Sequence, residues 1–349
     1  QNGTSEIFSF TAKQWDPVWT HDTTTDAETS AISDRGDVVV ATYGDTFSIF
    51  NPDSSSPEFT IDLDGKAILS SAISADGKYV AIGTGWTSGS DVGRLYVYSV
   101  GEDLTEEWTH TVSGYIYSVA ISSNGSHIVT GGQEGKVRWY SIDSNSPLAT
   151  QVVGDVNQVT ISADGQTYAA SCDNNKIYLF EDEDEEWKYS ISEDALSAQL
   201  TPDGSVLVVG ADDDKVYYFD TSSSTPSWSY DVGGAVWGID ISDDGNLIAV
   251  ASQSEEVYLL NSTGSLVWKY VSGEDFELVD ISGNGKYVVA GNVIGEVFLF
   301  NTDSSIPMAV HDIGSFVSET EFVLQALSFS QEGDWMSVSS KDNTVDLFR

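Results

Sequence analysis

Short β-rich segments separated by polar turns recur along this chain. Within residues 198–232 we expect four strands, at 199–201, 206–210, 215–219 and 226–230. The first strand ends in the turn Pro202-Asp203-Gly204, and an Asp-Gly pair tolerates the positive φ angles of a tight hairpin. Apolar and polar residues alternate only partly in the third strand, KVYYF, as in a strand covered on both faces. These residues predict one four-stranded antiparallel sheet.

The turn after the first strand, ISADG in its cleanest form, returns eight times at intervals of 39 to 48 residues. Repeats of about 40–45 residues made of short strands are typical of β-propeller blades. We therefore predict an all-β fold in which residues 1–349 form one domain, a single eight-bladed β-propeller of four-stranded antiparallel blades. The glycines that close the eight turns are Gly36, Gly77, Gly125, Gly165, Gly204, Gly245, Gly285 and Gly333.

The fourth strand carries an aromatic residue at one register in six repeats and an alanine, Ala149 or Ala309, in the other two. A large aromatic side chain that recurs at one blade position is expected to fill the gap between neighbouring blades. Stacking on a ligand is the alternative. The six aromatic residues are Trp19, Phe59, Trp108, Trp187, Trp228 and Trp268.

The ISDDG-type turns, KVYYF-type third strands and WSYDVGG-type fourth strands together resemble WD40-like and quinoprotein-like (PQQ-like) propeller repeats over essentially the whole chain. The Gly-His opening and Trp-Asp ending of true WD40 repeats are missing, and the tryptophan register is closer to the quinoprotein type. Quinoprotein dehydrogenases use adjacent cysteines beside their cofactor, whereas this chain has only Cys172. The resemblance therefore implies a non-enzymatic branch without a cofactor.

Acidic residues dominate the charge of the chain. There are 55 Asp and Glu against 14 Lys and Arg, which gives a net charge of −41. Such a surface repels nucleic-acid phosphates and anionic lipid heads, so we expect neither as a partner. It suits a salty or cation-rich exterior, where counterions screen the self-repulsion. Apolar runs are too short for a membrane helix, so we expect no membrane insertion.

We expect an extracellular or cell-surface protein. The chain begins at Gln1 rather than Met, which suggests removal of an upstream segment, and its surface residues are rich in Ser, Thr, Asp and Gly. Three Asn-X-Ser/Thr sequons, at Asn2, Asn124 and Asn261, would accept N-linked glycans in that setting. About three sequons arise by chance in a chain of this composition, so their number alone is not evidence of glycosylation.

Patterns for catalysis or metal binding are weak. His21, His110 and His311 share a fourth-strand register and so belong to different blades, which prevents their convergence on one metal ion. The acidic runs at 181–186 (EDEDEE) and 212–214 (DDD) lack the spacing of a calcium loop, and we expect solvated loops there. We predict no catalytic, metal-binding or cofactor-binding residues.

Two loops are longer than the repeat requires: residues 83–94, with Trp86, and residues 312–325, with Phe316 and Phe322. Loops that exceed the needs of a scaffold often carry contacts, and exposed aromatic residues dominate the binding energy of many interfaces. We predict that these three residues contact a partner. Local packing over the ring is the alternative.

The two ends of the chain together contain one strand too many. Residues 327–330, 335–340 and 344–348 supply three strands of the last blade, and residues 17–22 supply the fourth, which closes the ring. Residues 6–10 (EIFSF), with Ile7, Phe8 and Phe10, also match the third-strand pattern, so residues 1–11 are an extra strand or an inter-subunit arm. This strand would stack on a blade edge of its own subunit, be the remnant of a longer protein, or pair with a neighbouring molecule and build a filament.

These features predict a non-enzymatic extracellular propeller with a structural or interaction role. It would be a cell-surface or filament-forming component that presents loops to protein or glycan partners, including itself through its terminal strands. The alternative is an envelope assembly or ligand-binding scaffold that recognises a peptide or sugar at the ring face. A third reading, a degenerate quinoprotein-like enzyme, would require a convergent polar cluster at the channel mouth and a bound chromophore.

Overall fold

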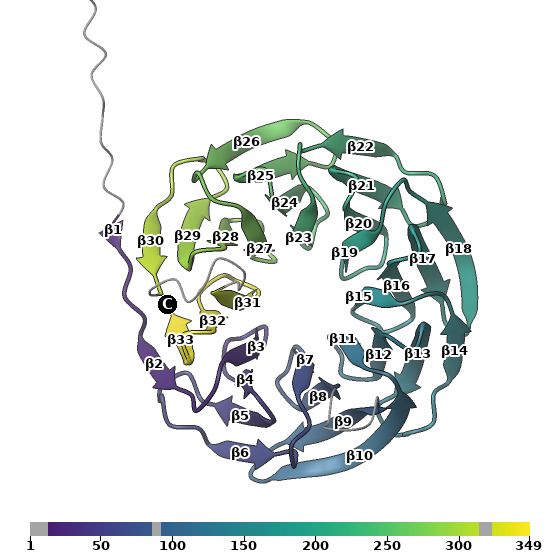
Figure 1. Cartoon of the computed structure of the whole chain (residues 1–349), viewed down its shortest axis with the longest axis vertical. Helices are drawn as coiled ribbons and strands as arrows, with labels where there is room; N and C mark the ends of the chain where they lie inside the picture. Colours follow the sequence, from purple (N-terminus) through teal and green to yellow (C-terminus); the bar gives the residue numbers. More distant parts are fainter. Residues whose placement is uncertain (1–12, 86–91, 314–322) are drawn as a thin grey trace, which may run out of the picture.

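The computed structural model describes residues 13–85, 92–313 and 323–349. Eight sheets, each containing four antiparallel strands, stand around a central channel, and sheets that follow one another in sequence are neighbours in the ring (Figure 1). The predicted eight-bladed propeller is confirmed. Within the described ranges, the chain has no helix with the length and apolar character needed to cross a membrane.

Each blade runs outward from a first strand at the channel to a fourth strand at the rim. We number the blades in chain order. Blade 1 comprises β3 (Ala27–Ile32), β4 (Val39–Tyr43), β5 (Thr46–Phe50) and β6 (Phe59–Asp62); blade 2, β7 (Ile68–Ile73), β8 (Tyr79–Thr84), β9 (Val92–Val100) and β10 (Leu104–Ser113); blade 3, β11 (Ile116–Ile121), β12 (His127–Gly132), β13 (Lys136–Ser141) and β14 (Ala149–Val152); blade 4, β15 (Val156–Ile161), β16 (Thr167–Cys172), β17 (Lys176–Glu181) and β18 (Asp184–Ser190). Blade 5 comprises β19 (Ala195–Leu200), β20 (Val206–Ala211), β21 (Lys215–Asp220) and β22 (Trp228–Asp231); blade 6, β23 (Val236–Ile241), β24 (Leu247–Ser252), β25 (Glu256–Asn261) and β26 (Leu266–Val271); blade 7, β27 (Phe276–Ile281), β28 (Tyr287–Asn292), β29 (Glu296–Asn301) and β30 (Ala309–Asp312); blade 8, β31 (Leu324–Phe329), β32 (Met336–Ser340), β33 (Thr344–Phe348) and β2 (Trp19–Asp22).

Blade 8 joins the two ends of the chain, as predicted. Its fourth strand, β2, pairs antiparallel with β33, with Trp19 opposite Leu347. A further short strand, β1 (Lys13–Gln14), adds in parallel to β30 at the outer edge of blade 7, which therefore has five strands. Residues 1–11, with Ile7, Phe8 and Phe10, lie outside the described residues, and the extra strand predicted there stays a prediction.

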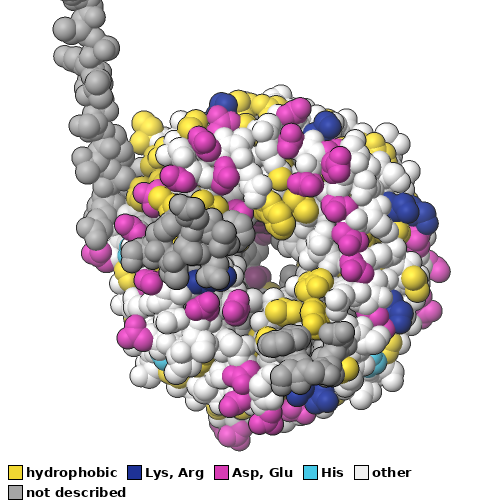
Figure 2. Space-filling model, in the orientation of Figure 1, with side chains coloured by type: hydrophobic (Ala, Val, Ile, Leu, Met, Phe, Trp, Pro, Cys, Tyr) yellow, Lys and Arg dark blue, Asp and Glu magenta, His cyan; other side chains and the backbone are white. Residues whose placement is uncertain are grey.

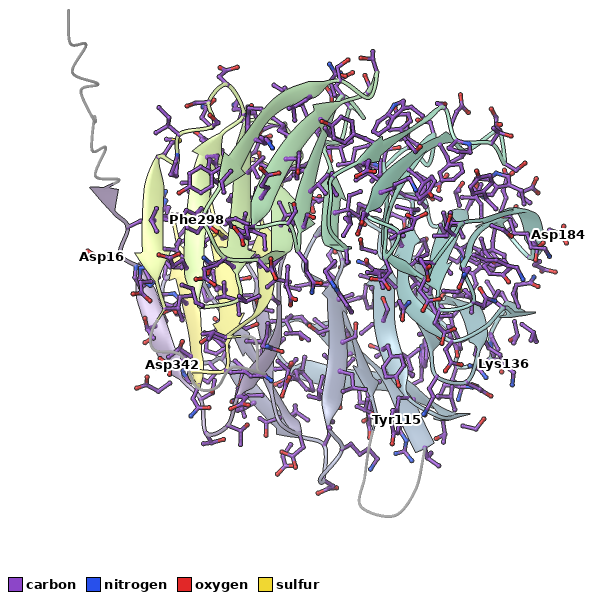
Figure 3. The ribbon with its side chains drawn as sticks, turned by 45° about the horizontal axis from the view of Figure 1, so that its top comes forward. Asp16, Tyr115, Lys136, Asp184, Phe298 and Asp342 are labelled. Atoms are coloured by element: carbon purple, nitrogen blue, oxygen red, sulfur yellow. The ribbon has the colours of Figure 1, made fainter. Side chains whose placement is uncertain are left out.

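The hydrophobic core lies between neighbouring blades. Second and third strands are buried on both faces, as in β4, where all five residues are buried, because each sheet packs against a sheet on either side. Fourth strands alternate half-buried and exposed residues, as in β22, since one of their faces meets solvent. The opening of the channel is visible in Figure 2. In Figure 3, Asp184 of β18 lies on the outer rim, across the ring from Asp16.

The recurring fourth-strand tryptophans seal the seams between blades. Each of five indole Nε1–H groups donates a hydrogen bond of 2.6–2.9 Å to a backbone carbonyl of the next blade, as Trp268 does to Thr302. The ring of Trp268 also packs against Phe300 of the third strand of that blade, with ring centroids 5.2 Å apart. The prediction that these residues fill the gaps between blades is confirmed. The five pairs are Trp19–Pro52, Trp108–Ile142, Trp187–Thr221, Trp228–Ser262 and Trp268–Thr302.

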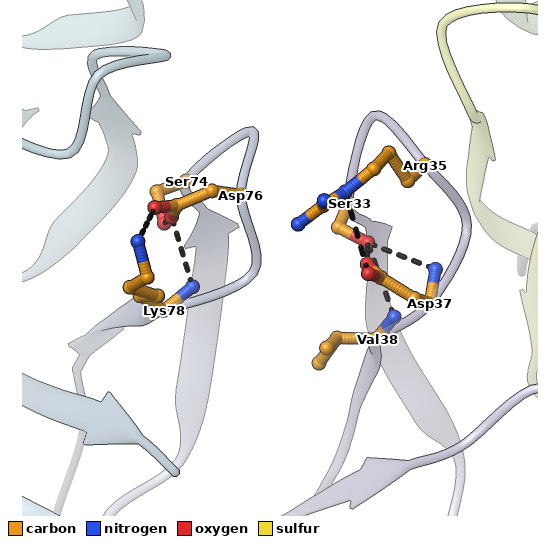
Figure 4. Close-up of polar contacts among 7 residues, drawn as sticks. All are labelled: Ser33, Arg35, Asp37, Val38, Ser74, Asp76 and Lys78. Carbon is orange, nitrogen blue, oxygen red and sulfur yellow. Dashed lines mark hydrogen bonds and ion pairs between the residues drawn. The ribbon is translucent and has the colours of Figure 1, made fainter.

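The repeated turn is held by the hydroxyl that ends the first strand. In blade 1, Ser33 Oγ accepts hydrogen bonds from the amides of Asp37 and Val38, both at 3.1 Å, and donates to the Asp37 carboxylate at 2.7 Å (Figure 4). Gly36 closes this turn with φ = +71°, where a Cβ atom would also clash with the ring of Trp335. The serine, aspartate and glycine of the repeated turn sequence are therefore needed to form the hairpin.

The acidic run at 181–186 is not a solvated loop, which corrects the prediction. Glu181 ends β17, Asp184–Glu186 begin β18, and only residues 182–183 form the turn, with Asp182 at φ = +49°. Long charged side chains are compatible with an edge hairpin, because they keep the edge of a sheet soluble. The run at 212–214 does form a hairpin turn, as predicted, but it is not fully solvated. The Asp213 side chain is only 5% exposed and accepts a hydrogen bond of 2.6 Å from the Tyr217 hydroxyl.

Candidate site at the channel mouth

Every first strand carries a β-bulge at its second residue, where the pairing with the second strand shifts by one. A bulge redirects a side chain out of the regular ladder. Because all first strands begin at the same face of the ring, the eight bulged residues surround the mouth of the channel there. We call this set the bulge ring: Glu28, Leu69, Tyr117, Asn157, Leu196, Trp237, Glu277 and Gln325.

Apolar side chains occupy half of the bulge ring. Trp237 has 49% of its surface exposed and Tyr117 has 40%, although both are large aromatic residues. Tyr115 lies beside Tyr117, with ring centroids 6.1 Å apart in an edge-to-face arrangement. Figure 2 looks onto this face and shows hydrophobic side chains on two sides of the central opening. Exposed aromatic rings that do not fill a core favour contact with a partner.

Two half-buried carboxyl groups complete the ring on the side of blades 7 and 1. Burial raises the pKa of Glu277 to about 7, although Gln253 Nε2 donates a hydrogen bond of 3.1 Å to its Oε1. Burial also raises the pKa of Glu28, an effect that the charge of Lys341 partly offsets. A cation brought to these carboxylates would favour their ionised form. The mouth therefore offers aromatic surface next to carboxyl groups.

Deeper in the channel, the fifth residues of the first strands form a hydrogen-bonded arc. Thr160 Oγ1 donates to Gln199 Oε1 at 3.1 Å, and the carboxyl groups of Asp240 and Asp280 are bonded to each other. Asp280 Oδ2 also accepts the amide of Phe329, at 2.9 Å. Burial, with the neighbouring carboxylate, raises the pKa of Asp280 well above its usual range. Asp240 also accepts the amide of Ile281, at 2.9 Å, so the two carboxyl groups tie blades 6, 7 and 8 together.

The predicted site residues are scattered. Trp86, Phe316, Phe322 and Asn2 lie outside the described residues, so their roles stay predictions. Asn124 is exposed in its hairpin turn, and its Oδ1 accepts the amide of Ser126 at 2.9 Å. Asn261 ends β25, where its Oδ1 accepts the amide of Thr263 at 3.0 Å. Glycosylation of these asparagines also stays a prediction.

His21, His110 and His311 lie on the fourth strands of three different blades, as their register predicts. Cys172 is buried at the end of β16, and burial raises the pKa of its thiol. In the part of the chain that the structure describes, no three His, Cys, Asp or Glu side chains are placed to hold a metal ion.

Sequence reasoning missed Trp237, Tyr117 and Glu277. The signal was present: each stands at the second residue of a first strand, directly after the buried residue that opens the strand. A tryptophan or tyrosine there falls outside the register of the seam tryptophans, and it keeps 40–49% of its surface exposed. These residues could be recognised as exposed only once the bulge was known. The bulge appears in the pairing of two strands and cannot be seen in the sequence of one strand.

Residues 132–345, more than half of the chain, match the family described as outer membrane protein assembly factor BamB. The chain belongs to this BamB-like family of PQQ-type propeller repeats. Residues 105–141 of the BamB-like propeller also match the WD domain, G-beta repeat. The resemblance to WD40-like and PQQ-like repeats is therefore confirmed. No curated protein matches this sequence.

A solved structure with the same fold is that of Chaetomium thermophilum Sqt1 bound to the N-terminus of the ribosomal protein L10. It matches with a TM-score of 0.79 over 96% of this chain and 100% of that chain, at 12% sequence identity. At this identity the likeness shows the fold alone. The BamB-like propeller thus shares the ring architecture of this solved structure.

Proposed function

We propose that this BamB-like propeller is a non-enzymatic scaffold that binds a segment of a partner protein across the bulge ring. The observation that carries the proposal is the exposure of Trp237 and Tyr117 at the channel mouth, at 49% and 40%. Aromatic anchors of this kind supply most of the binding energy in many interfaces. The likeness to Sqt1, whose structure holds the N-terminus of a ribosomal protein, supports a polypeptide as the ligand.

The charge of the scaffold favours a basic partner segment. The net charge of −41 attracts cations over long distances. Glu277 belongs to the blade next to that of Trp237, and Glu28 adds a second carboxyl group to the ring. A lysine or arginine on the partner would pair with these carboxylates, while its neighbouring apolar residues contact Trp237 and Tyr117. The same ring would reject acidic segments.

Substitution of the two aromatic residues tests this site. On an array of 12-residue peptides with basic, acidic or neutral flanks around one aromatic residue, the protein is expected to retain basic peptides. Trp237→Ala and Tyr117→Ala should each weaken binding about tenfold or more, because they remove aromatic contact surface. Val152→Ala, at a rim residue that is 80% exposed, is the matched control and should leave binding unchanged. Equal retention of acidic peptides, or equal loss in all three variants, would contradict the proposal.

Binding of a basic peptide should also depend on pH through Glu277. Its pKa is about 7, so the carboxyl group is largely protonated at pH 6 and ionised at pH 8. Only the ionised form attracts a cation, so affinity is expected to rise several-fold between these pH values. Titration calorimetry on Glu277→Gln should show a flatter profile. A rise of the same size in this variant would assign the effect to another group.

We also propose that the protein works outside the cell, at the cell surface. Its acidic composition and single buried cysteine support this setting. Labelling of intact source cells with a membrane-impermeant amine reagent should modify the protein. Labelling of the protein only after the cells are lysed would contradict a location at the cell surface. The same array experiment can be run with glycans in place of peptides. Retention of glycans but not of basic peptides would favour a glycan ligand.

Self-association, as in a surface filament, is a second proposed function. It is favoured by β1, a fifth strand that blade 7 receives from the N-terminal segment. Light scattering over a range of protein concentrations tests it, with a monomer at all concentrations as the contrary result.

A further inference from the structure

Among the described residues, four of the eight seams of the propeller share an aromatic bracket. The residues at two alternate positions of a fourth strand pack on one aromatic residue that ends the third strand of the next blade. In the seam between blades 8 and 1, Trp19 and His21 lie 5.3 and 4.9 Å from Phe50, measured between ring centroids. The same bracket is formed by Trp108 and His110 on Tyr140, by Trp187 and Tyr189 on Phe219, and by Trp268 and Tyr270 on Phe300.

The seam between blades 7 and 8 takes half of its bracket from the N-terminal segment. The two fourth-strand positions are Ala309 and His311, and His311 packs on Phe348 at 5.0 Å. The place of the missing tryptophan is taken by Trp15, whose ring lies 4.5 Å from that of Phe348. The parallel pairing of Lys13 with Ala309, in strand β1, brings Trp15 there. Trp15 therefore fills the space that the small side chain of Ala309 leaves in this seam.

This seam is also open on its outer side. In the seams of His21 and His110, the histidine Nδ1 bonds a carbonyl in the third-to-fourth loop of the next blade, at 2.9 and 2.8 Å. Blade 8 has no such loop, because β33 and β2 come from opposite ends of the chain. The Nδ1 atom of His311 is buried without a hydrogen-bond partner among the described residues. A cavity of about 320 Å³ remains here, lined by Trp15, Leu299, Met308, Phe329, Met336 and Phe348 among others.

The segment that fills the seam is joined to the ring by a short hinge. Only four residues, 15–18, separate β1 from β2. Pro17 lies within them, and a proline disfavours the helical conformation of the residue before it and so favours an extended path. Short hinges of this kind allow an edge strand to be exchanged between identical molecules, which reproduces every contact of the closed form.

Charge further favours such an exchange. Residues 1–15 contain one acidic residue, Glu6, and one basic residue, Lys13, in a chain with a net charge of −41. The approach of this neutral segment to a second molecule meets far less repulsion than the approach of two acidic rings. Trp15 of this segment gains from burial in an apolar seam, where it packs against Phe348.

We propose that the seam between blades 7 and 8 is an acceptor for the N-terminal strand of a second copy of this chain, with Trp15 as the anchor. The donor strand pairs in parallel with β30, and its indole ring completes the bracket on Phe348. A one-way exchange leaves the acceptor's own strand available for a third copy, so the contact propagates head to tail. This inference rests on the proposed self-association and names the segment and the site that produce it.

Directed cross-linking tests the exchange in the full-length protein. Gln14 and Val310 are paired neighbours, at a backbone separation that suits a disulfide. In a Cys172→Ala background, Gln14→Cys and Val310→Cys are purified separately, mixed and oxidised. A disulfide between the two variants, at twice the 37.6 kDa mass of the chain on a non-reducing gel, is expected. A mixture that stays monomeric, while the double variant closes its disulfide within one chain, would overturn strand exchange.

Two controls make the result specific. Addition of Trp15→Ala to the Gln14→Cys donor should lower the dimer yield about tenfold, because it removes the buried anchor. Ser222→Cys, at an exposed position of blade 5, replaces Val310→Cys as the acceptor and should give no dimer. Dimer yields unaffected by Trp15→Ala would also refute the proposal. Oligomers seen by light scattering without this cross-link would refute strand exchange and leave self-association standing.

Discussion

Replacement of Trp268 by alanine is expected to lower the free energy of unfolding by about 3–5 kcal/mol, the usual cost of removing a large buried aromatic side chain. Trp268 is 9% exposed, packs on Phe300 and donates a hydrogen bond of 2.7 Å to Thr302 of the next blade. Its removal opens a cavity in the seam and leaves the Thr302 carbonyl without this donor. Urea denaturation followed by intrinsic fluorescence measures the loss.

Trp237→Ala is the matched control, because it removes the same side chain from a position outside the seams. With 49% of its surface exposed, Trp237 should contribute less than about 1 kcal/mol to stability. Equal losses for the two variants would show that the seam tryptophans are not the main source of cohesion between blades.

Asp280→Asn is expected to stabilise the protein at pH 8, by about 1–3 kcal/mol. Burial and the adjacent Asp240 raise the pKa of Asp280 well above its usual range, so the folded protein holds a proton that the unfolded chain releases. The stability that Asp280 contributes is therefore complete below its unfolded pKa and falls as the pH rises towards the folded value. Asparagine keeps an acceptor for the Phe329 amide and supplies a donor towards Asp240.

The gain should shrink towards pH 4, where Asp280 is protonated in the folded protein and about half protonated in the unfolded chain. Thermal unfolding at pH 4, 6 and 8 measures this trend. Asp203→Asn gives a control of opposite sign, because hydrogen bonds from Thr201 and Ser205 lower the pKa of that carboxyl group. This variant should lose a little stability at pH 8. A loss of stability at pH 8 in Asp280→Asn would show that the channel carboxylates are held in another way.

The period of the repeat was sufficient to predict the ring, because each blade is a local unit whose hairpins form from adjacent residues. The turn glycines, the second and third strands and the seam tryptophans all follow from such local patterns. Trp268 illustrates this. The residues that it contacts in the next blade occur one repeat later in the sequence, so the position of one tryptophan in its repeat predicts the contacts of the others.

Features that depend on departures from the repeat were harder to predict. Trp237 occupies a bulge, and nothing within residues 236–241 distinguishes a bulged strand from a regular one. The role of Trp15 was also hidden, because its partner Phe348 lies at the other end of the chain. The absence of an aromatic residue at Ala309 was visible in the sequence, but the residue that replaces it became visible only with the parallel pairing of β1.

The composition of blade 8 has a consequence for how this protein is made. During synthesis, β2 is made before the other seven blades, yet its partner β33 is made after them. Blades 1 to 7 can form while the chain between β2 and β31 is made, but blade 8 must wait for β33. Pairing across so long a sequence separation is slow. A circular permutant that joins the present ends and opens the loop at 221–227 would make blade 8 from consecutive strands and shift this delay to blade 5.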